Sequence, residues 1–135
     1  VCDKRWETEW HHPWFYNEFL RGNTNAVRMP DGNYLATFHT VVKLGPSMHY
    51  YDNGFYTFEG KPPCRVIGCA NKTYLPAESA TAIHFRKKNL ITVCFPVGMT
   101  LDEEKILVSY GDNDSVVKIL ATTLEAAKKT IVPIY

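Results

Sequence analysis

Polar residues that could carry chemistry gather near the ends of the predicted strands. Arg21 and Asn23 precede the first strand, His39 lies among apolar neighbours on the second, and Tyr110 and Asp114 stand at the end of a later one. An imidazole can bind an anionic oxygen near neutral pH, and carboxylates can share acid and base roles in glycoside chemistry. These five residues are the candidate substrate-binding residues of the sequence.

Each candidate also has an ordinary structural interpretation. A single His in a strand is commonly a hydrogen-bonded structural residue, and Arg21 is compatible with a surface cation. Residues 112–114 (Asp-Asn-Asp) are typical of a turn, because Asp and Asn bond their own backbone and tolerate left-handed dihedral angles. Taken singly, none of these residues predicts an enzyme.

Hydrophobic alternation and turn residues predict short strands from residue 25 onward. Residues 1–20 show neither helical nor strand periodicity and are expected to form an irregular lead-in. Residues 31–32 (Asp-Gly) mark a tight hairpin turn, residues 53–54 (Asn-Gly) are expected to break a strand, and a short helix is predicted at 124–129. The expected strands are residues 25–29, 34–42, 48–51, 53–59, 64–69, 82–85, 90–95, 97–100, 106–110 and 116–122.

The strand pattern repeats along the chain. Residues 34–40 align with residues 106–112, and each copy follows a short strand and a charged turn. A unit of about four short antiparallel strands is typical of one propeller blade. We therefore predict an all-β fold of about two antiparallel blades, residues 21–80 and residues 81–135, in one partial domain. A small β-sandwich with similar hairpins is the alternative.

Two blades do not close a propeller, which needs at least about four. Two blades alone would leave long unpaired strand edges and an uncovered apolar face. We expect the chain to be one part of a larger protein, with the remaining blades, or self-association, covering these edges.

The composition excludes several classes of protein. Of 135 residues, 45% are hydrophobic and 13% aromatic, which argues against a disordered chain. The net charge of +1, with both signs interspersed, argues against a nucleic-acid partner. No apolar run approaches the roughly 20 residues of a transmembrane helix. The four cysteines lack the spacing of a zinc site, so we expect no metal and no cofactor, and no feature indicates a compartment.

Two blocks of sequence resemble a known family. Residues 95–99 read FPVGM, and residues 106–114 read ILVSYGDND after a charged turn. Together they resemble the last-blade signature of five-bladed propellers in the β-mannoside phosphorylase family and the related mannosyltransferases. Residues 25–42, with their Asp-Gly turn and a strand ending in Phe-His, resemble the preceding blade, although Thr40 stands where the family has Gly.

The resemblance implies roles for three of the candidate residues. Asp114 would hold sugar hydroxyls near the propeller axis, Tyr110 would shape the sugar pocket, and His39 would lie near a phosphate or acceptor site. The arginine and lysine set that binds phosphate in the family is missing from this sequence, unless Arg21 stands in for one member; Asn23, which follows close after Arg21, receives no role from the resemblance. The family's catalytic Asp comes from an early blade that this sequence lacks, so the resemblance implies no catalytic residue here.

Three functions follow as hypotheses. The first is part of an inverting β-mannoside phosphorylase or mannosyltransferase, inactive as an isolated chain, with carbohydrate and phosphate or a nucleotide sugar as partners. The second is a carbohydrate-binding module without catalysis. The third is a structural or interaction β domain.

Overall fold

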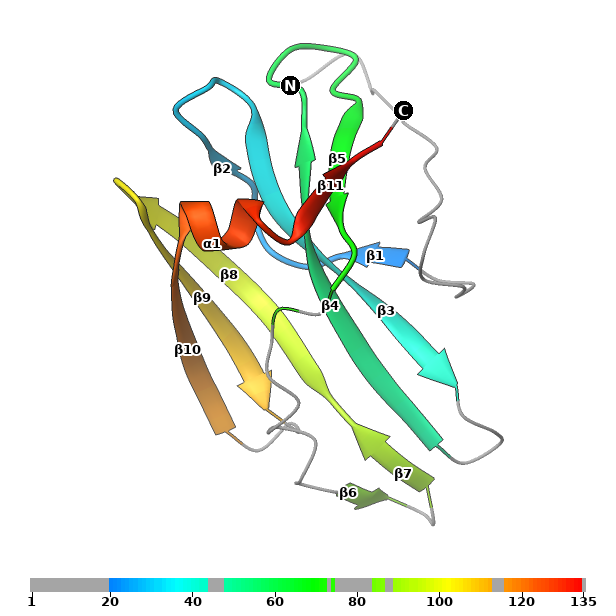
Figure 1. Ribbon diagram of the computed structural model, residues 1–135. Helices are drawn as coiled ribbons and strands as arrows, with labels where there is room; N and C mark the ends of the chain where they lie inside the picture. Colours follow the sequence, from blue (N-terminus) through cyan, green and yellow to red (C-terminus); the bar gives the residue numbers. More distant parts are fainter. Residues whose placement is uncertain are drawn as a thin grey trace, which may run out of the picture.

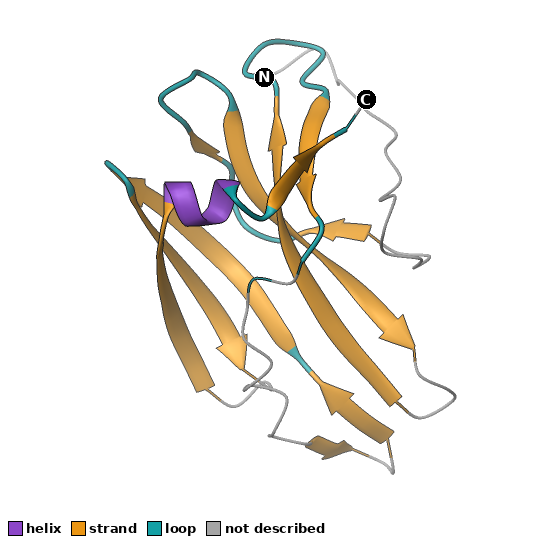
Figure 2. Ribbon diagram, in the orientation of Figure 1, coloured by secondary structure: helices purple, strands orange, loops and turns teal. Residues whose placement is uncertain are grey.

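The computed structural model describes residues 20–43, 48–72, 74, 84–86, 89–112 and 116–134. Most of the predicted lead-in (residues 1–19) and the first two residues of the predicted strand 82–85 lie outside the described residues. Strands make up most of the described chain, with one short helix among them (Figure 2). The elements in chain order are β1 (Leu20–Gly22), β2 (Val27–Arg28), β3 (Tyr34–Lys43), β4 (Met48–Phe58), β5 (Val66–Ala70), β6 (His84–Arg86), β7 (Asn89–Thr92), β8 (Cys94–Asp102), β9 (Lys105–Asp112), β10 (Val116–Thr123), α1 (Leu124–Lys128) and β11 (Ile131–Pro133).

The strands form two sheets (Figure 1). The first sheet has the order β1-β3-β4-β5-β11, with β2 paired to β3 and the β6–β7 hairpin attached to β4. The second sheet has the order β10-β9-β8. All pairings are antiparallel among the described strands except that of β7 with β4, which is parallel. The predicted all-β fold of antiparallel, propeller-like blades is confirmed, and so is the short helix after β10.

The long hairpin of β3 and β4 organises the first sheet. Its side chains alternate between two faces because successive residues of a strand point to opposite sides. Leu35 and Phe55 are almost fully buried on one face, whereas Tyr34 and Phe58 stack on the other with ring centroids 5.3 Å apart. The β2–β3 turn contains Gly32 at φ +87°, a left-handed conformation that glycine adopts without strain, as the Asp-Gly pattern predicts.

One hydrophobic core joins the two sheets and the helix. Leu35 and Phe55 of the first sheet pack with a set of apolar side chains from the rest of the chain. Burying these side chains is the main favourable contribution to folding. The two sheets and the helix are therefore held together as one packed body. The remaining members of this core are Met29, Met99, Ile106, Val108, Leu124 and Ala127.

The repeat seen in the sequence has a structural counterpart. β3 pairs with β1, β2 and β4, and β9 pairs with β8 and β10, so each repeated segment is an inner strand with partners on both sides. The predicted division between residues 80 and 81 stays a prediction, because residues 75–83 lie outside the described ones. After α1 the chain returns to the first sheet, where β11 pairs with β5 (Figure 1).

Two local strand predictions are wrong, one of a break and one of a continuous strand. β4 runs through Asn53 and Gly54 without interruption. Gly54 serves close packing instead, since an added Cβ would lie 2.4 Å from Cζ of Phe38. The predicted strand 90–95 is divided at Val93, because β7 pairs with the first sheet and β8 with the second. The chain thus changes sheets at a point that local pattern does not mark.

Helix α1 has five residues, and no helix in the described part of the chain is long and apolar enough to cross a membrane.

Candidate functional site

One face of β3 changes from apolar to polar along its length. Leu35, Thr37 and His39 are alternate residues and so share the face that is turned toward the second sheet. Leu35 belongs to the hydrophobic core. Thr37 and His39 are also buried, with exposed fractions of 0% and 2%. Buried polar groups need hydrogen-bond partners, so this end of the face requires a polar network.

A chain of hydrogen bonds starts at His39 and crosses to the second sheet. Nδ1 of His39 makes a short hydrogen bond with Oδ1 of Asn23. Nδ2 of Asn23 donates to Oδ1 of Asn53 at 3.3 Å, and Nδ2 of Asn53 donates to the carbonyl oxygen of Cys94 at 3.0 Å. Because a carboxamide oxygen only accepts, Nδ1 of His39 carries the proton. Each later member of the chain is then fixed in orientation.

The opposite ring nitrogen of His39 is left as an acceptor. Burial, with a smaller contribution from the positive charge of Arg21, lowers the pKa of His39 from its ordinary value of 6.5. The imidazole is therefore neutral at pH 7, and Nε2 carries a lone pair. Nε2 is buried and has no hydrogen-bond partner among the residues that the structure describes. An unsatisfied buried acceptor is costly, which makes it a feature that calls for a functional explanation.

Two aromatic rings pack against the ring of His39. The ring centroid of Phe95 lies 4.8 Å from that of His39, and the centroid of Tyr51 lies 5.5 Å from it. Tyr51 and Phe95 meet each other edge to face at 6.4 Å. Phe95 is 37% exposed, so this ring forms the outer wall of the cluster. We call His39, Asn23, Asn53, Tyr51 and Phe95 the histidine cluster.

Three predicted candidates come together here. β1 pairs with β3 so that Arg21 lies opposite His39. Asn23 follows β1 directly, and its backbone N–H donates to the carbonyl of Thr37 at 3.0 Å, which holds its side chain beside the imidazole. The position of Arg21, Asn23 and His39 in one site follows from the pairing of β1, a strand that the sequence pattern did not predict.

The other two candidates belong to the second half of the chain. Tyr110 lies on β9 opposite Pro96 and next to Lys118 of β10. Desolvation by its surroundings raises the pKa of Tyr110. The structure does not join Tyr110 to the histidine cluster by any hydrogen bond between described residues. Asp114 lies outside the described residues, so its predicted role stays a prediction.

The residues beside Asp114 need a correction. The turn predicted at residues 112–114 does not include Asp112, which is the last residue of β9 and is 7% exposed. Its carboxylate forms an ion pair with Lys118, and this hydrogen bond raises the pKa of the lysine. A local turn signal is overruled here because a basic partner on the neighbouring strand holds the carboxylate in the sheet.

Sequence reasoning missed Asn53, Tyr51 and Phe95 as members of the site. The sequence pattern predicts Asn53 to lie in a strand break and includes Phe95 only in the FPVGM motif. The available signal was register: in a β3–β4 hairpin of this length Asn53 lies opposite His39. A buried Asn opposite a buried His on one sheet face indicates a shared hydrogen-bond network.

The chain was compared with known proteins. Neither the family models nor the curated proteins give a match. Among solved structures, the crystal structure of a glycosyl hydrolase from Bacteroides ovatus matches with a TM-score of 0.55 and 17% sequence identity. The match covers 78% of this chain and 30% of the hydrolase chain. At this identity the likeness shows a shared fold, one that a carbohydrate-active protein also uses, and this chain spans less than a third of that protein.

Proposed function

We propose that this chain is part of a carbohydrate-active β-propeller protein and that the histidine cluster binds a sugar. The observation that carries the proposal is the unpartnered Nε2 of a neutral, buried His39 beside the rings of Phe95 and Tyr51. A saccharide offers both hydroxyl donors and apolar C–H faces. The hydroxyl satisfies the lone pair of Nε2, and the C–H face packs against an aromatic ring.

The histidine cluster is suited to positioning a ligand. Its acceptor is fixed by the hydrogen bonds through Asn23 and Asn53, so little freedom is lost when a ligand hydroxyl reaches it. Because Nε2 itself is buried, a ligand reaches it only when a neighbouring side chain moves, and we propose that the partly exposed ring of Phe95 is the one that turns aside. Such a rotation is within the ordinary motions of an exposed aromatic side chain.

The more specific proposal is a β-mannoside phosphorylase or a related mannosyltransferase. It rests on the FPVGM and ILVSYGDND motifs and on the fold shared with a glycosyl hydrolase. In this proposal Asp114 holds sugar hydroxyls, and phosphate or a nucleotide sugar is the second partner. The general acid comes from a blade outside this sequence, so the 135-residue chain binds sugar but does not turn it over. A binding module that never had catalysis would behave in the same way.

The test is a calorimetric titration of the 135-residue chain with mannose and with β-linked mannobiose. We expect weak saturable binding that Phe95→Ala and His39→Gln each reduce by roughly tenfold, about 1.4 kcal/mol. Val97→Ala is the matched control, because Val97 lies two residues from Phe95 on β8 and is 62% exposed. Asp114→Ala tests the predicted sugar carboxylate separately. Absence of binding by the unsubstituted chain, or equal loss in Val97→Ala, would contradict the proposal.

A second candidate function is structural, and β10 favours it. Val116, Val117 and Ile119 on this edge strand are 54%, 81% and 68% exposed. This edge has no strand partner within the described part of the chain, and apolar side chains on such an edge are a site for pairing with another strand. The match covers 30% of the glycosyl hydrolase, so the part of that protein outside the match is more than twice as long as the matched part. We therefore propose that a further blade of the same kind pairs with β10.

A further inference from the structure

A groove lies at one end of β3, and the histidine cluster lies farther along the strand, toward the other end. The groove runs between the β2–β3 turn and the loop from Glu59 to Arg65, and its volume is about 610 Å³. The nearest residue of β3 is Tyr34, five residues before His39, which separates the two sites by roughly 17 Å at the usual rise of a strand. We call it the hairpin groove. None of its lining residues belongs to the histidine cluster.

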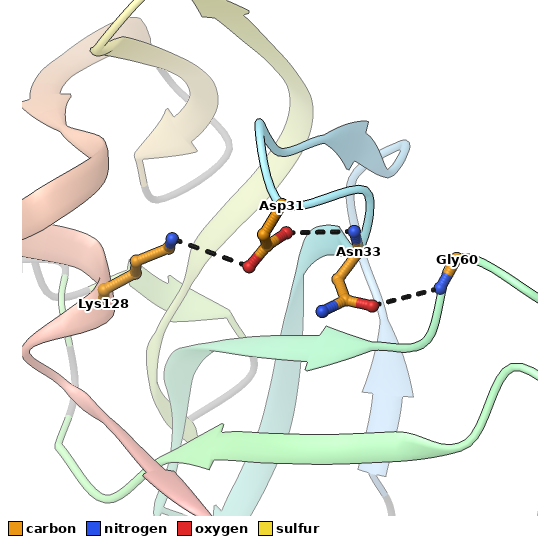
Figure 3. Close-up of polar contacts among 4 residues, drawn as sticks. All are labelled: Asp31, Asn33, Gly60 and Lys128. Carbon is orange, nitrogen blue, oxygen red and sulfur yellow. Dashed lines mark hydrogen bonds and ion pairs between the residues drawn. The ribbon is translucent and has the colours of Figure 1, made fainter.

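The two walls of the hairpin groove are bound to each other. The backbone N–H of Gly60 donates to Oδ1 of Asn33 at 3.3 Å (Figure 3). A Cβ on Gly60 would lie 2.0 Å from the carbonyl oxygen of Gly32, so only glycine permits this approach. The loop is closed on itself by backbone bonds between Glu59 and Arg65 at 2.9 Å and between Cys64 and Lys61 at 2.9 Å. The groove is therefore a formed feature of the fold.

The acidic groups of the groove are already engaged. One oxygen of the Asp31 carboxylate accepts from the backbone N–H of Asn33 at 3.0 Å, and the other lies 3.8 Å from Nζ of Lys128 on α1 (Figure 3). Oε2 of Glu59 accepts from the backbone N–H of Arg65 at 3.3 Å. Both carboxylates are thus held by donors of the protein and are less available to a ligand.

The basic groups of the groove are not neutralised. Arg28, Lys61 and Arg65 line it and are exposed. None of these three side chains forms an ion pair within the described part of the chain. The guanidinium of Arg28 reaches over the turn, with Nη2 4.0 Å from the position of a Cβ on Gly32. Three cations and two carboxylates therefore line the groove, so its positive charges exceed its negative charges by one.

We propose that the hairpin groove binds an oxyanion, either phosphate itself or the phosphate ester of a sugar. Two guanidinium groups supply paired N–H donors that match tetrahedral oxyanions, and Lys61 adds a point charge. A groove of about 610 Å³ also has room for the organic part of an ester. This proposal does not rest on the function proposed for the histidine cluster, since the two sites share no residue.

The test is a titration of the ¹⁵N-labelled 135-residue chain, with the amide signals of Gly32, Gly60 and Arg65 as the readout. The probes are inorganic phosphate, glucose 6-phosphate and glucose. We expect saturable shifts with the two phosphates and none at these amides with glucose. Glucose 6-phosphate binding roughly tenfold more tightly than inorganic phosphate assigns the groove to an ester, and equal affinities assign it to free phosphate.

Three charge-neutral variants and one control make the test specific. Arg28→Gln, Lys61→Gln and Arg65→Gln should each weaken phosphate binding roughly threefold, because each removes one exposed cation. Lys72→Gln is the matched control, since Lys72 is an exposed lysine beyond the opposite end of β5. All four positions are exposed, and an unchanged amide spectrum elsewhere verifies the fold. Phosphate shifts that do not saturate, or equal weakening by Lys72→Gln, would overturn the proposal.

Discussion

His39 shows how one residue links burial, charge and hydrogen bonding. Its exposed fraction is 2%, and its Nδ1 proton is held by Asn23. Burial and the charge of Arg21 both disfavour the protonated ring and lower its pKa. The same two causes keep Nε2 an acceptor at neutral pH, which is the property that the proposed sugar site requires.

The lowered pKa predicts a pH dependence of stability. Between pH 6.5 and the lower pKa of the folded state, the unfolded chain binds a proton at His39 and the folded chain does not. The free energy of unfolding therefore falls as the pH drops through this window, by about 1.4 kcal/mol per pH unit for this residue. Above pH 6.5 His39 contributes no slope.

Urea unfolding checks this pH dependence of stability. The natural chain and His39→Gln are each measured between pH 8 and pH 5 in steps of about half a pH unit. The variant should lack the loss of stability that begins near pH 6.5. Since all other titrating groups are shared, the difference between the two curves isolates His39. Parallel curves across the whole range would contradict the lowered pKa.

At the scale of elements, the close contact between β3 and β4 depends on a small residue. Gly54 lies against the ring of Phe38, and a Cβ there would come within 2.4 Å and 2.6 Å of two ring carbons and 3.1 Å of Cβ of Ala70. Phe38 is itself almost fully buried, so its ring has little space to move. Glycine therefore allows the strand to continue where its turn-like pattern predicted a break.

We predict that Gly54→Ala lowers the free energy of unfolding by about 1–3 kcal/mol, the usual cost of overpacking a core. Gly111→Ala is the matched control, because Gly111 lies in β9 with nothing within 4 Å of an added Cβ. The control should change stability by no more than about 0.5 kcal/mol. Denaturant unfolding of both variants measures the two changes in the free energy of unfolding. Equal changes would mean that the close packing of Gly54 against Phe38 is unimportant.

At the scale of the whole molecule, the outer edge of the second sheet is the feature that most affects how the protein associates. β10 pairs with β9 on one side and has no strand partner on the other within the described residues. Its first residues expose Val116, Val117 and Ile119. The first sheet, by contrast, gains β11 after α1. The chain thus extends one sheet with its own C-terminal strand and leaves the other available.

We predict that the isolated 135-residue chain self-associates through β10 when no further blade covers it. Replacing Val117 and Ile119 together by Lys should weaken this association by roughly tenfold or more, because charges on an edge strand oppose pairing. Analytical ultracentrifugation over a range of concentrations measures the effect. Ala126→Lys, on the exposed side of α1, is the control. A chain that is monomeric at every concentration would contradict this role for β10.

Local pattern was sufficient to predict much of the secondary structure. The Asp-Gly turn before β3, the strands around it, and the helix after β10 were all predicted from residue type and spacing. These features depend on dihedral preferences and on period-two alternation, which act over a few residues. The sequence also singled out Arg21, Asn23 and His39, because polar residues beside apolar strands are conspicuous.

What the tertiary structure alone decided is which distant residues meet. Asn53 joins His39 to the second sheet, Asp112 is held by Lys118, and β11 returns to β5. Each of these contacts depends on strand register and on the packing of two sheets, which are cooperative properties of the whole chain. Individual residue preferences do not encode such pairings, so the histidine cluster could be assembled only once the sheets were in place.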